Sequence, residues 1–184
     1  MIPLQYINGE IDPRWYGEVH QDAFVYEQCG RKNDGTFLDL GCWEPVHSSN
    51  SLALEQKGWK GVLVDVDPYY TQMCRDWGRK NPIITARVED LDWKAVCAQY
   101  GLDIAIDYLS MDVEGSELLM LRHFVSLGFS FHVITCEHNA HNGGSYLVER
   151  DKQREFLFSQ GYTLAIPDVQ NSTGLVFEDW WTKF

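Results

Sequence analysis

Five short apolar segments recur along the chain at nearly even spacing, and this rhythm limits the fold more than any other feature. The segments lie at 36–40, 62–66, 83–88, 106–111 and 132–137. Amphipathic stretches of helical length separate them, at 49–57, 69–79, 93–100 and 117–127. Strands that alternate with helices indicate βαβ units, whose parallel sheet is covered by helices on both faces. We therefore predict a doubly wound, Rossmann-like α/β sheet.

The C-terminal part of the chain departs from this rhythm. A helical stretch at 147–160 leads to an apolar run at 162–167, a polar turn at 168–174 and a second run at 175–178. Two runs this close leave no room for a crossover helix, so we predict an antiparallel hairpin. The sheet then has seven strands, five parallel ones plus the hairpin. We expect the following Trp180 and Trp181 to cover a sheet edge or to contact a second subunit.

Length and charge narrow the class of protein. The 184 residues suit one domain over 1–184, in which 1–34 form an N-terminal arm and a lead-in helix at 19–29. With 15 basic and 27 acidic residues the net charge is −12, which disfavours electrostatic binding to nucleic acid or anionic membranes. The five cysteines include no CxxC pair, and the N-terminus shows no signal-peptide pattern. We expect reduced thiols and a cytoplasmic location.

The turn after the first predicted strand indicates what the sheet binds. It contains Gly41, the first glycine of a GxGxxG pattern, but Trp43 and Val46 occupy the other two glycine positions. Without the second glycine the backbone cannot approach a pyrophosphate, and Glu44 would add a negative charge beside it. A dinucleotide is therefore disfavoured. S-adenosylmethionine fits better, because it carries a sulfonium and an ammonium group and no phosphate.

Acidic residues follow the first three predicted strands. Asp65 ends the second strand, close to the offset at which an acid binds a ribose diol in such folds. Glu89 and Asp90 follow the third, where they would accept from the adenine amino group or cap the next helix. For Asp39 two roles stay open, a contact with the cofactor and a hydrogen bond that organises the loop.

The same residues form a larger pattern over 17–139. Its members are Gln21-Asp22, Asp39, Gly41, Glu44-Pro45, Ser49-Asn50, the run 58–61, Asp65, Asp107, Asp112, Glu114, Gly115, Glu117 and Glu137-His138-Asn139. This pattern resembles the FkbM family of S-adenosylmethionine-dependent methyltransferases, and the resemblance implies the class I methyltransferase fold. The cofactor contacts that we expect are Asp39, Gly41, Cys42, Glu44, Asn50, Asp65, Val66, Glu89, Asp90 and Asp112.

Four ionisable residues stand at the ends of the fourth and fifth predicted strands, and they are Asp112, Glu114, Glu137 and His138. Neighbouring strand ends meet at one edge of the sheet, so we expect all four to converge on the acceptor. Close carboxylates raise one another's pKa, which makes Glu114 one expected general base. His138 is the other, because histidine titrates near neutral pH. A divalent metal held by Asp112, Glu137 and His138 is the less favoured alternative. For Glu117 we expect a capping role.

The resemblance implies an O-methyltransferase that acts on a small polar acceptor, such as a sugar hydroxyl of a glycan or natural product. The alternative is a regulatory or scaffold protein that binds S-adenosylmethionine without turnover. A chain of 184 residues barely covers a catalytic core, so short loops or the second subunit of a homodimer would have to complete the recognition of the acceptor.

Overall fold

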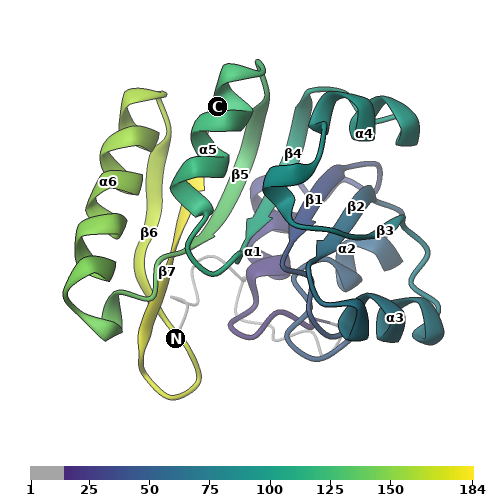
Figure 1. Ribbon diagram of the computed structural model, residues 1–184, viewed down its shortest axis with the longest axis horizontal. Helices are drawn as coiled ribbons and strands as arrows, with labels where there is room; N and C mark the ends of the chain where they lie inside the picture. The colour runs from purple at the N-terminus through teal and green to yellow at the C-terminus, as the bar shows by residue number, and fades with distance from the viewer. Residues whose placement is uncertain (1–14) are drawn as a thin grey trace.

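The computed structural model describes residues 15–184, which form one seven-stranded sheet between helices (Figure 1). The strands are β1 (Thr36–Leu40), β2 (Lys60–Asp65), β3 (Ile83–Thr85), β4 (Ala105–Met111), β5 (Ser130–Glu137), β6 (Thr163–Gln170) and β7 (Val176–Thr182). Their order is β3-β2-β1-β4-β5-β7-β6, and β7 is antiparallel to both of its neighbours. The predicted doubly wound sheet with a C-terminal antiparallel hairpin is therefore confirmed.

Helices cover both faces of the sheet. They are α1 (Gln21–Gln28), α2 (Leu52–Gln56), α3 (Pro68–Trp77), α4 (Trp93–Tyr100), α5 (Glu117–Ser126) and α6 (Ser145–Ser159), with short 3₁₀ turns η2 (Val88–Asp90) and η3 (Ala140–Asn142). Buried residues of α4, α5 and α6 belong to one apolar cluster, and those of α1, α2 and α3 belong to a second cluster. The two clusters lie on opposite faces, because successive residues of a strand point to opposite sides.

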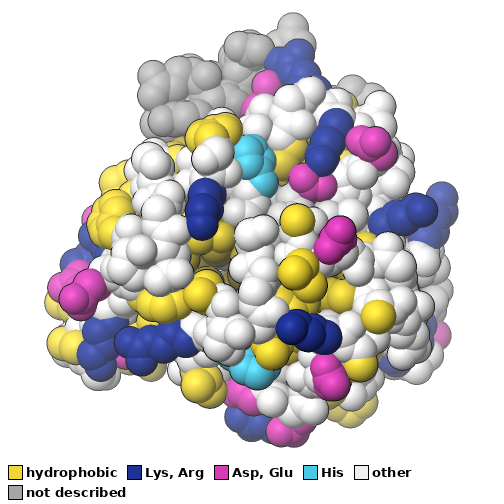
Figure 2. All heavy atoms as spheres, turned by 90° about the horizontal axis from the view of Figure 1, so that it is seen from above, with side chains coloured by type: hydrophobic (Ala, Val, Ile, Leu, Met, Phe, Trp, Pro, Cys, Tyr) yellow, Lys and Arg dark blue, Asp and Glu magenta, His cyan; other side chains and the backbone are white. Residues whose placement is uncertain are grey.

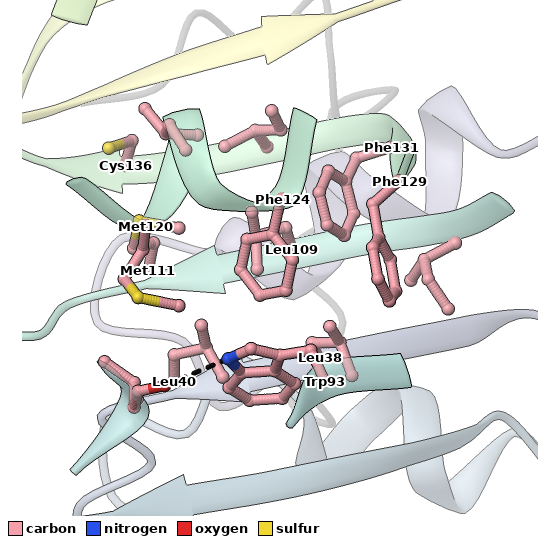
Figure 3. Close-up of a cluster of buried hydrophobic side chains, with 14 of the residues drawn as sticks. Leu38, Leu40, Trp93, Leu109, Met111, Met120, Phe124, Phe129, Phe131 and Cys136 are labelled. Carbon is pink, nitrogen blue, oxygen red and sulfur yellow. Dashed lines mark hydrogen bonds between the residues drawn. The ribbon is translucent and has the colours of Figure 1, made fainter. Parts of the chain in front are cut away.

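The larger of the two clusters shows how the strands and helices meet (Figure 3). Leu38 and Leu40 of β1 point toward α4 and α5, whereas Phe37, the residue before Leu38, belongs to the other cluster. Trp93, the first residue of α4, packs its ring 5.1 Å from that of Phe124, and its Nε1 donates to the Val88 carbonyl (3.0 Å). Burying one such large side chain stabilises the fold by roughly 1.5–3 kcal/mol.

Several predicted boundaries shift, each for a local reason. The third strand stops at Thr85, because Val88 already belongs to η2. The helix expected over 49–57 is shorter, since Ser49 and Ser51 make hydrogen bonds with Arg79 before α2 begins. At α3, Asp67 accepts from the Tyr69 N–H (2.8 Å) and Pro68 is the first helical residue, as the sequence predicts.

The C-terminal hairpin forms as predicted, but its second strand is more buried than expected. β7 lies between β5 and β6 and extends to Thr182, so the chain inserts its last strand into the sheet. Trp180 and Trp181 consequently have relative exposures of 0% and 1%. The prediction that they cover an edge or contact a second subunit is wrong, because they are buried residues of a strand that has a neighbour on each side.

The lead-in helix is α1, whereas the N-terminal arm lies mostly outside the described residues. Four of the five free cysteines are buried, and Cys29 is partly exposed. In the described part of the chain no helix is both long and apolar enough to cross a membrane. On the face shown in Figure 2, basic and acidic side chains are interspersed rather than gathered by sign.

Candidate functional site

A cavity of about 490 Å³ opens at the carboxyl ends of the parallel strands. It lies where the strand order reverses between β1 and β4, the place where doubly wound sheets bind their ligands. Its volume falls within the usual range of small-molecule sites. Residues from the turn after β1, from the ends of β2, β4 and β5, from β7 and from the segment before α1 line it.

Gly41 brings the turn after β1 close to the end of β4. Its φ is +82°, and a methyl group on its Cα would overlap the backbone oxygen of Asp112. The Asp112 N–H donates to the Leu40 carbonyl (2.9 Å), and this hydrogen bond holds the ends of β1 and β4 together. Position 41 therefore requires glycine both for its backbone angle and for the space that it leaves.

The loop between Gly41 and α2 is held by a buried arginine. Arg79, just beyond α3, pairs with Glu55 (3.3 Å) and donates to the Pro45 carbonyl (3.3 Å) and to Ser51 Oγ (2.8 Å). Ser51 in turn donates to Asp39, which lines the cavity. Of the two roles considered for Asp39, the structure shows the loop-organising hydrogen bond.

Asp65 ends β2 and lies at the cavity with both carboxylate oxygens positioned by the backbone. Oδ2 accepts from the Trp43 N–H (2.9 Å), and Oδ1 accepts from the Asp67 N–H (2.9 Å). Trp43 adopts a positive φ of 45°, so the turn after β1 bends to bring its N–H to Asp65. Each carboxylate oxygen has two lone pairs, and one on each stays available to a ligand.

Three carboxyl groups meet beside the cavity, and we call them the carboxyl cluster: Asp112, Glu114 and Glu137. One ligand oxygen from each lies within 4.8 Å of the others, close enough to hold a metal ion. Asp112 keeps an exposed face in the cavity, but the protein around it reduces its hydration and raises its pKa to about 6. Burial and the nearby Asp112 raise the pKa of Glu137 further, and the two carboxyls share a hydrogen bond. Near neutral pH this pair therefore holds one proton.

His138 does not join the carboxyl cluster, so that part of the prediction is wrong. It follows Glu137 directly and points to the opposite side of the strand end, where its side chain has no exposed surface. Its Nδ1 accepts from the Ala140 N–H (3.1 Å), and its Nε2 lies 3.5 Å from Asp179 Oδ1. The proposed metal set with His138 fails for the same reason, and Glu114 takes the place of the histidine.

The buried surroundings of His138 are already balanced in charge. Burial alone would raise the pKa of Asp179, but hydrogen bonds from Arg154 and His138 lower it to about 2. Arg154 Nε donates to Asp179 Oδ2 (2.7 Å). His138, Asp179 and Arg154 thus tie the hairpin to α6.

Most of the other predicted site residues line the cavity, and the rest lie outside its lining. The predicted cofactor contacts that line the cavity are Asp39, Gly41, Cys42, Asn50, Asp65, Val66, Glu89 and Asp112. Glu44 and Asp90 are not in the lining, which contradicts the contacts expected of them. Glu44 follows the lining residue Trp43 but precedes the next one, Ser48, and Asp90 directly follows Glu89, the last lining residue after β3. Glu117, expected to cap α5, accepts from the Val113 and Gly115 N–H groups (3.1 Å each) and so holds the loop after β4.

Glu178 is the functional candidate that the sequence analysis missed. It lies in the middle of β7, is 4% exposed and lines the cavity. Its Oε1 accepts from Gln21 Nε2 (2.8 Å) and from Trp180 Nε1 (2.7 Å). Burial raises its pKa to about 8 despite the hydrogen bond from Trp180. An acid within a tryptophan-rich apolar run was a usable signal, but its position beside the cavity depends on the insertion of β7.

No protein-family model and no curated protein matches this sequence. Solved structures with the same fold do match. Precorrin-6y C5,15-methyltransferase from Geobacter metallireducens GS-15 is 16% identical with a TM-score of 0.61, over 88% of this chain and 87% of that chain. An O-methyltransferase from Bacillus cereus in complex with SAH is 11% identical with a TM-score of 0.59, over 97% of this chain and 85% of that chain.

A third match is an SAH-bound methyltransferase from Podospora anserina, 11% identical with a TM-score of 0.59, over 89% of this chain and 78% of that chain. At these identities the matches establish the fold. The chain has the Rossmann-like fold of class I methyltransferases.

Proposed function

We propose that this chain is an S-adenosylmethionine-dependent methyltransferase. The observation that carries the proposal is the charge of the cavity, whose lining holds one basic side chain, Arg87, against eight acidic ones. The acidic residues are Glu18, Asp39, Asp65, Asp67, Glu89, Asp112, Glu114 and Glu178. This lining would repel a pyrophosphate and favours a cationic ligand. Two solved structures with this fold, from Bacillus cereus and Podospora anserina, are described as bound to SAH, which supports the same choice.

The residues present fit this cofactor. Asp65 is the acid that we assign to the ribose hydroxyls, because both of its oxygens are fixed at a strand end and keep a free lone pair. Asn50 lines the cavity, and its buried Oδ1 has no hydrogen-bond donor within residues 15–184. A buried oxygen without a partner is costly, so we assign it to a donor on the ligand. Gly41 also lines the cavity, and its lack of a side chain lets the Asp112 backbone approach the turn after β1.

When bound, the cofactor supplies an activated methyl group, and the protein has to align the acceptor and remove its proton. We assign the removal of the acceptor's proton to Asp112, because this residue faces the cavity and its pKa of about 6 leaves it ionised near neutral pH. Glu137 keeps its own proton there and positions Asp112 through their shared hydrogen bond. Since this pair already holds one proton, we favour a route without a metal.

We also propose the type of methyltransferase and the kind of acceptor. The resemblance over 17–139 supports an FkbM-type O-methyltransferase that acts on a small polar acceptor, such as a sugar hydroxyl. The non-catalytic alternative is not favoured, because Asp112 and Glu114 both face the cavity. A screen of glycan and natural-product acceptors with S-adenosylmethionine, read by the mass of one added methyl group, tests this assignment. Methylation of none of these acceptors by a protein that binds the cofactor would contradict it.

Asp65→Ala is expected to weaken binding of S-adenosylhomocysteine, the demethylated product. Hydrogen bonds to a charged group contribute roughly 1.5–3 kcal/mol, which corresponds to about 10- to 150-fold in affinity. Isothermal calorimetry measures the affinity, and a urea melt shows whether the variant is folded. Asp76→Ala, an exposed aspartate in α3, is the matched control and should bind as the wild type does. A folded Asp65→Ala variant with unchanged affinity would remove Asp65 from the site.

A further inference from the structure

We infer that the methyl acceptor carries a protonated amine and that Glu178 binds this ammonium group at the β7 side of the cavity. The inference rests on the proposed function and concerns the acceptor part of the same cavity. It goes beyond a neutral sugar, because it assigns the acceptor a charge and names the carboxylate that recognises it.

The first step is the geometry of Glu178. Both hydrogen bonds from the protein, from Gln21 Nε2 and from Trp180 Nε1, go to Oε1. Within residues 15–184 no donor is hydrogen-bonded to Oε2, although the side chain is 96% buried and lines the cavity. The lone pairs of Oε2 are therefore open to a ligand N–H in the cavity. The two donors also fix the orientation of the carboxyl group before any ligand arrives.

The second step is the charge that surrounds Glu178. Asp112 and Glu18 both line the cavity, and both make ionisation of Glu178 less favourable. Glu137 is its register partner on the neighbouring β5 strand. Arg87 is the one basic residue of the lining, and it follows β3 at the opposite edge of the sheet from β7. With its pKa raised to about 8, Glu178 is mostly protonated near neutral pH in the absence of a ligand. An ammonium group beside it would favour the ionised carboxylate and offset the neighbouring acidic charges, whereas a neutral acceptor would do neither.

The cofactor does not balance this charge by itself. S-adenosylmethionine carries two positive groups and one carboxylate. Of the residues assigned to it, Asp65 ends β2, and Asn50 donates to Ser110 Oγ of β4 (3.1 Å). Glu178 stands in β7, on the far side of β4 and β5. Phe177 also lines the cavity, and an aromatic ring next to a carboxylate suits an amine with an apolar body.

Two probes of nearly equal size and shape test the inference, 2-phenylethylamine and 2-phenylethanol. Ligand-observed NMR measures the affinity of each for the protein saturated with S-adenosylhomocysteine. The wild type should bind the amine about 10- to 100-fold more tightly than the alcohol, the range for a hydrogen bond to a charged group. Glu178→Gln should remove most of this preference and leave the affinity for S-adenosylhomocysteine unchanged. The amide oxygen of Gln can still accept from Gln21 and Trp180, so the variant tests charge rather than folding.

Two further variants make the outcome decisive. Glu155→Gln removes one exposed charge on α6 and should keep the full preference for the amine. Glu18→Gln, at the exposed rim of the cavity, should lower the preference by about two- to fivefold, even if Glu178→Gln does not fold. Equal affinities for amine and alcohol in the wild type, or no binding of either, would overturn the inference. Failure of S-adenosylhomocysteine itself to bind would instead contradict the proposed function.

Discussion

Gly41→Ala is expected to destabilise the protein by roughly 2 to 5 kcal/mol and to weaken binding of S-adenosylhomocysteine by more than about tenfold. Two costs combine. A positive φ of 82° costs a residue with a Cβ roughly 1–2 kcal/mol, and the steric overlap with the Asp112 backbone adds about 1–3 kcal/mol. Relief of the overlap would move the ends of β1 and β4 apart, and both ends line the cavity. Urea unfolding and calorimetry measure the two effects.

The matched control is Gly101→Ala at the end of α4. Gly101 also has a positive φ, 68°, but nothing lies within 4 Å of the position that a Cβ would take. This variant should show only the backbone cost of roughly 1–2 kcal/mol and should bind S-adenosylhomocysteine as the wild type does. If Gly41→Ala were as stable as Gly101→Ala and bound S-adenosylhomocysteine equally well, the close approach of Gly41 to Asp112 would not be needed for stability or for cofactor binding.

Asp112→Asn is expected to lower kcat by about 10²- to 10⁴-fold, the usual contribution of a general base. The variant has no carboxylate to take the proton of the acceptor, but it keeps the shape of the side chain. In the wild type, kcat should fall as the pH drops below about 6, because Asp112 becomes protonated there. The measurement is the pH profile of turnover on any acceptor that the screen identifies.

Glu114→Gln is the comparison, because it removes a neighbouring charge from the carboxyl cluster and leaves the proposed base in place. Its kcat should fall by less than about tenfold, within the size of a neighbouring-charge effect. Turnover by the wild type should also survive a metal chelator. Complete loss of turnover with chelator, restored by magnesium, would replace the proposed route with a metal-dependent one. Normal turnover in Asp112→Asn would remove Asp112 as the base.

The sequence predicts most of this fold because its strands are buried on both faces. Runs such as 36–40 and 106–111 are mainly apolar with no strict alternation of polar residues, and the spacing between runs leaves room for one helix each. The position of the last strand could not be read in the same way. A hairpin predicts which two strands pair, but the hydrophobic pattern of β7 does not distinguish the edge of the sheet from the position between β5 and β6 that it occupies.

Some residues of the candidate site were predictable from the sequence, and others were not. Asp65 and Asp112 were predictable, because each follows an apolar run and strand ends meet at the cavity. His138 was misplaced because the chain position after β5 does not show on which side of the strand end the ring lies. Glu178 was missed because its place beside β5 follows from the inserted strand. Local patterns therefore found the residues at the ends of parallel strands, whereas long-range pairing determined the rest.

The central claim is that the acidic cavity at the β1–β4 reversal binds S-adenosylmethionine and not a dinucleotide. Calorimetric titration of the wild-type protein with S-adenosylhomocysteine and, separately, with NAD tests it most directly. The account predicts a Kd of about 1–100 μM for S-adenosylhomocysteine and no measurable binding of NAD. Binding of NAD in that range, with none of S-adenosylhomocysteine, would contradict the account.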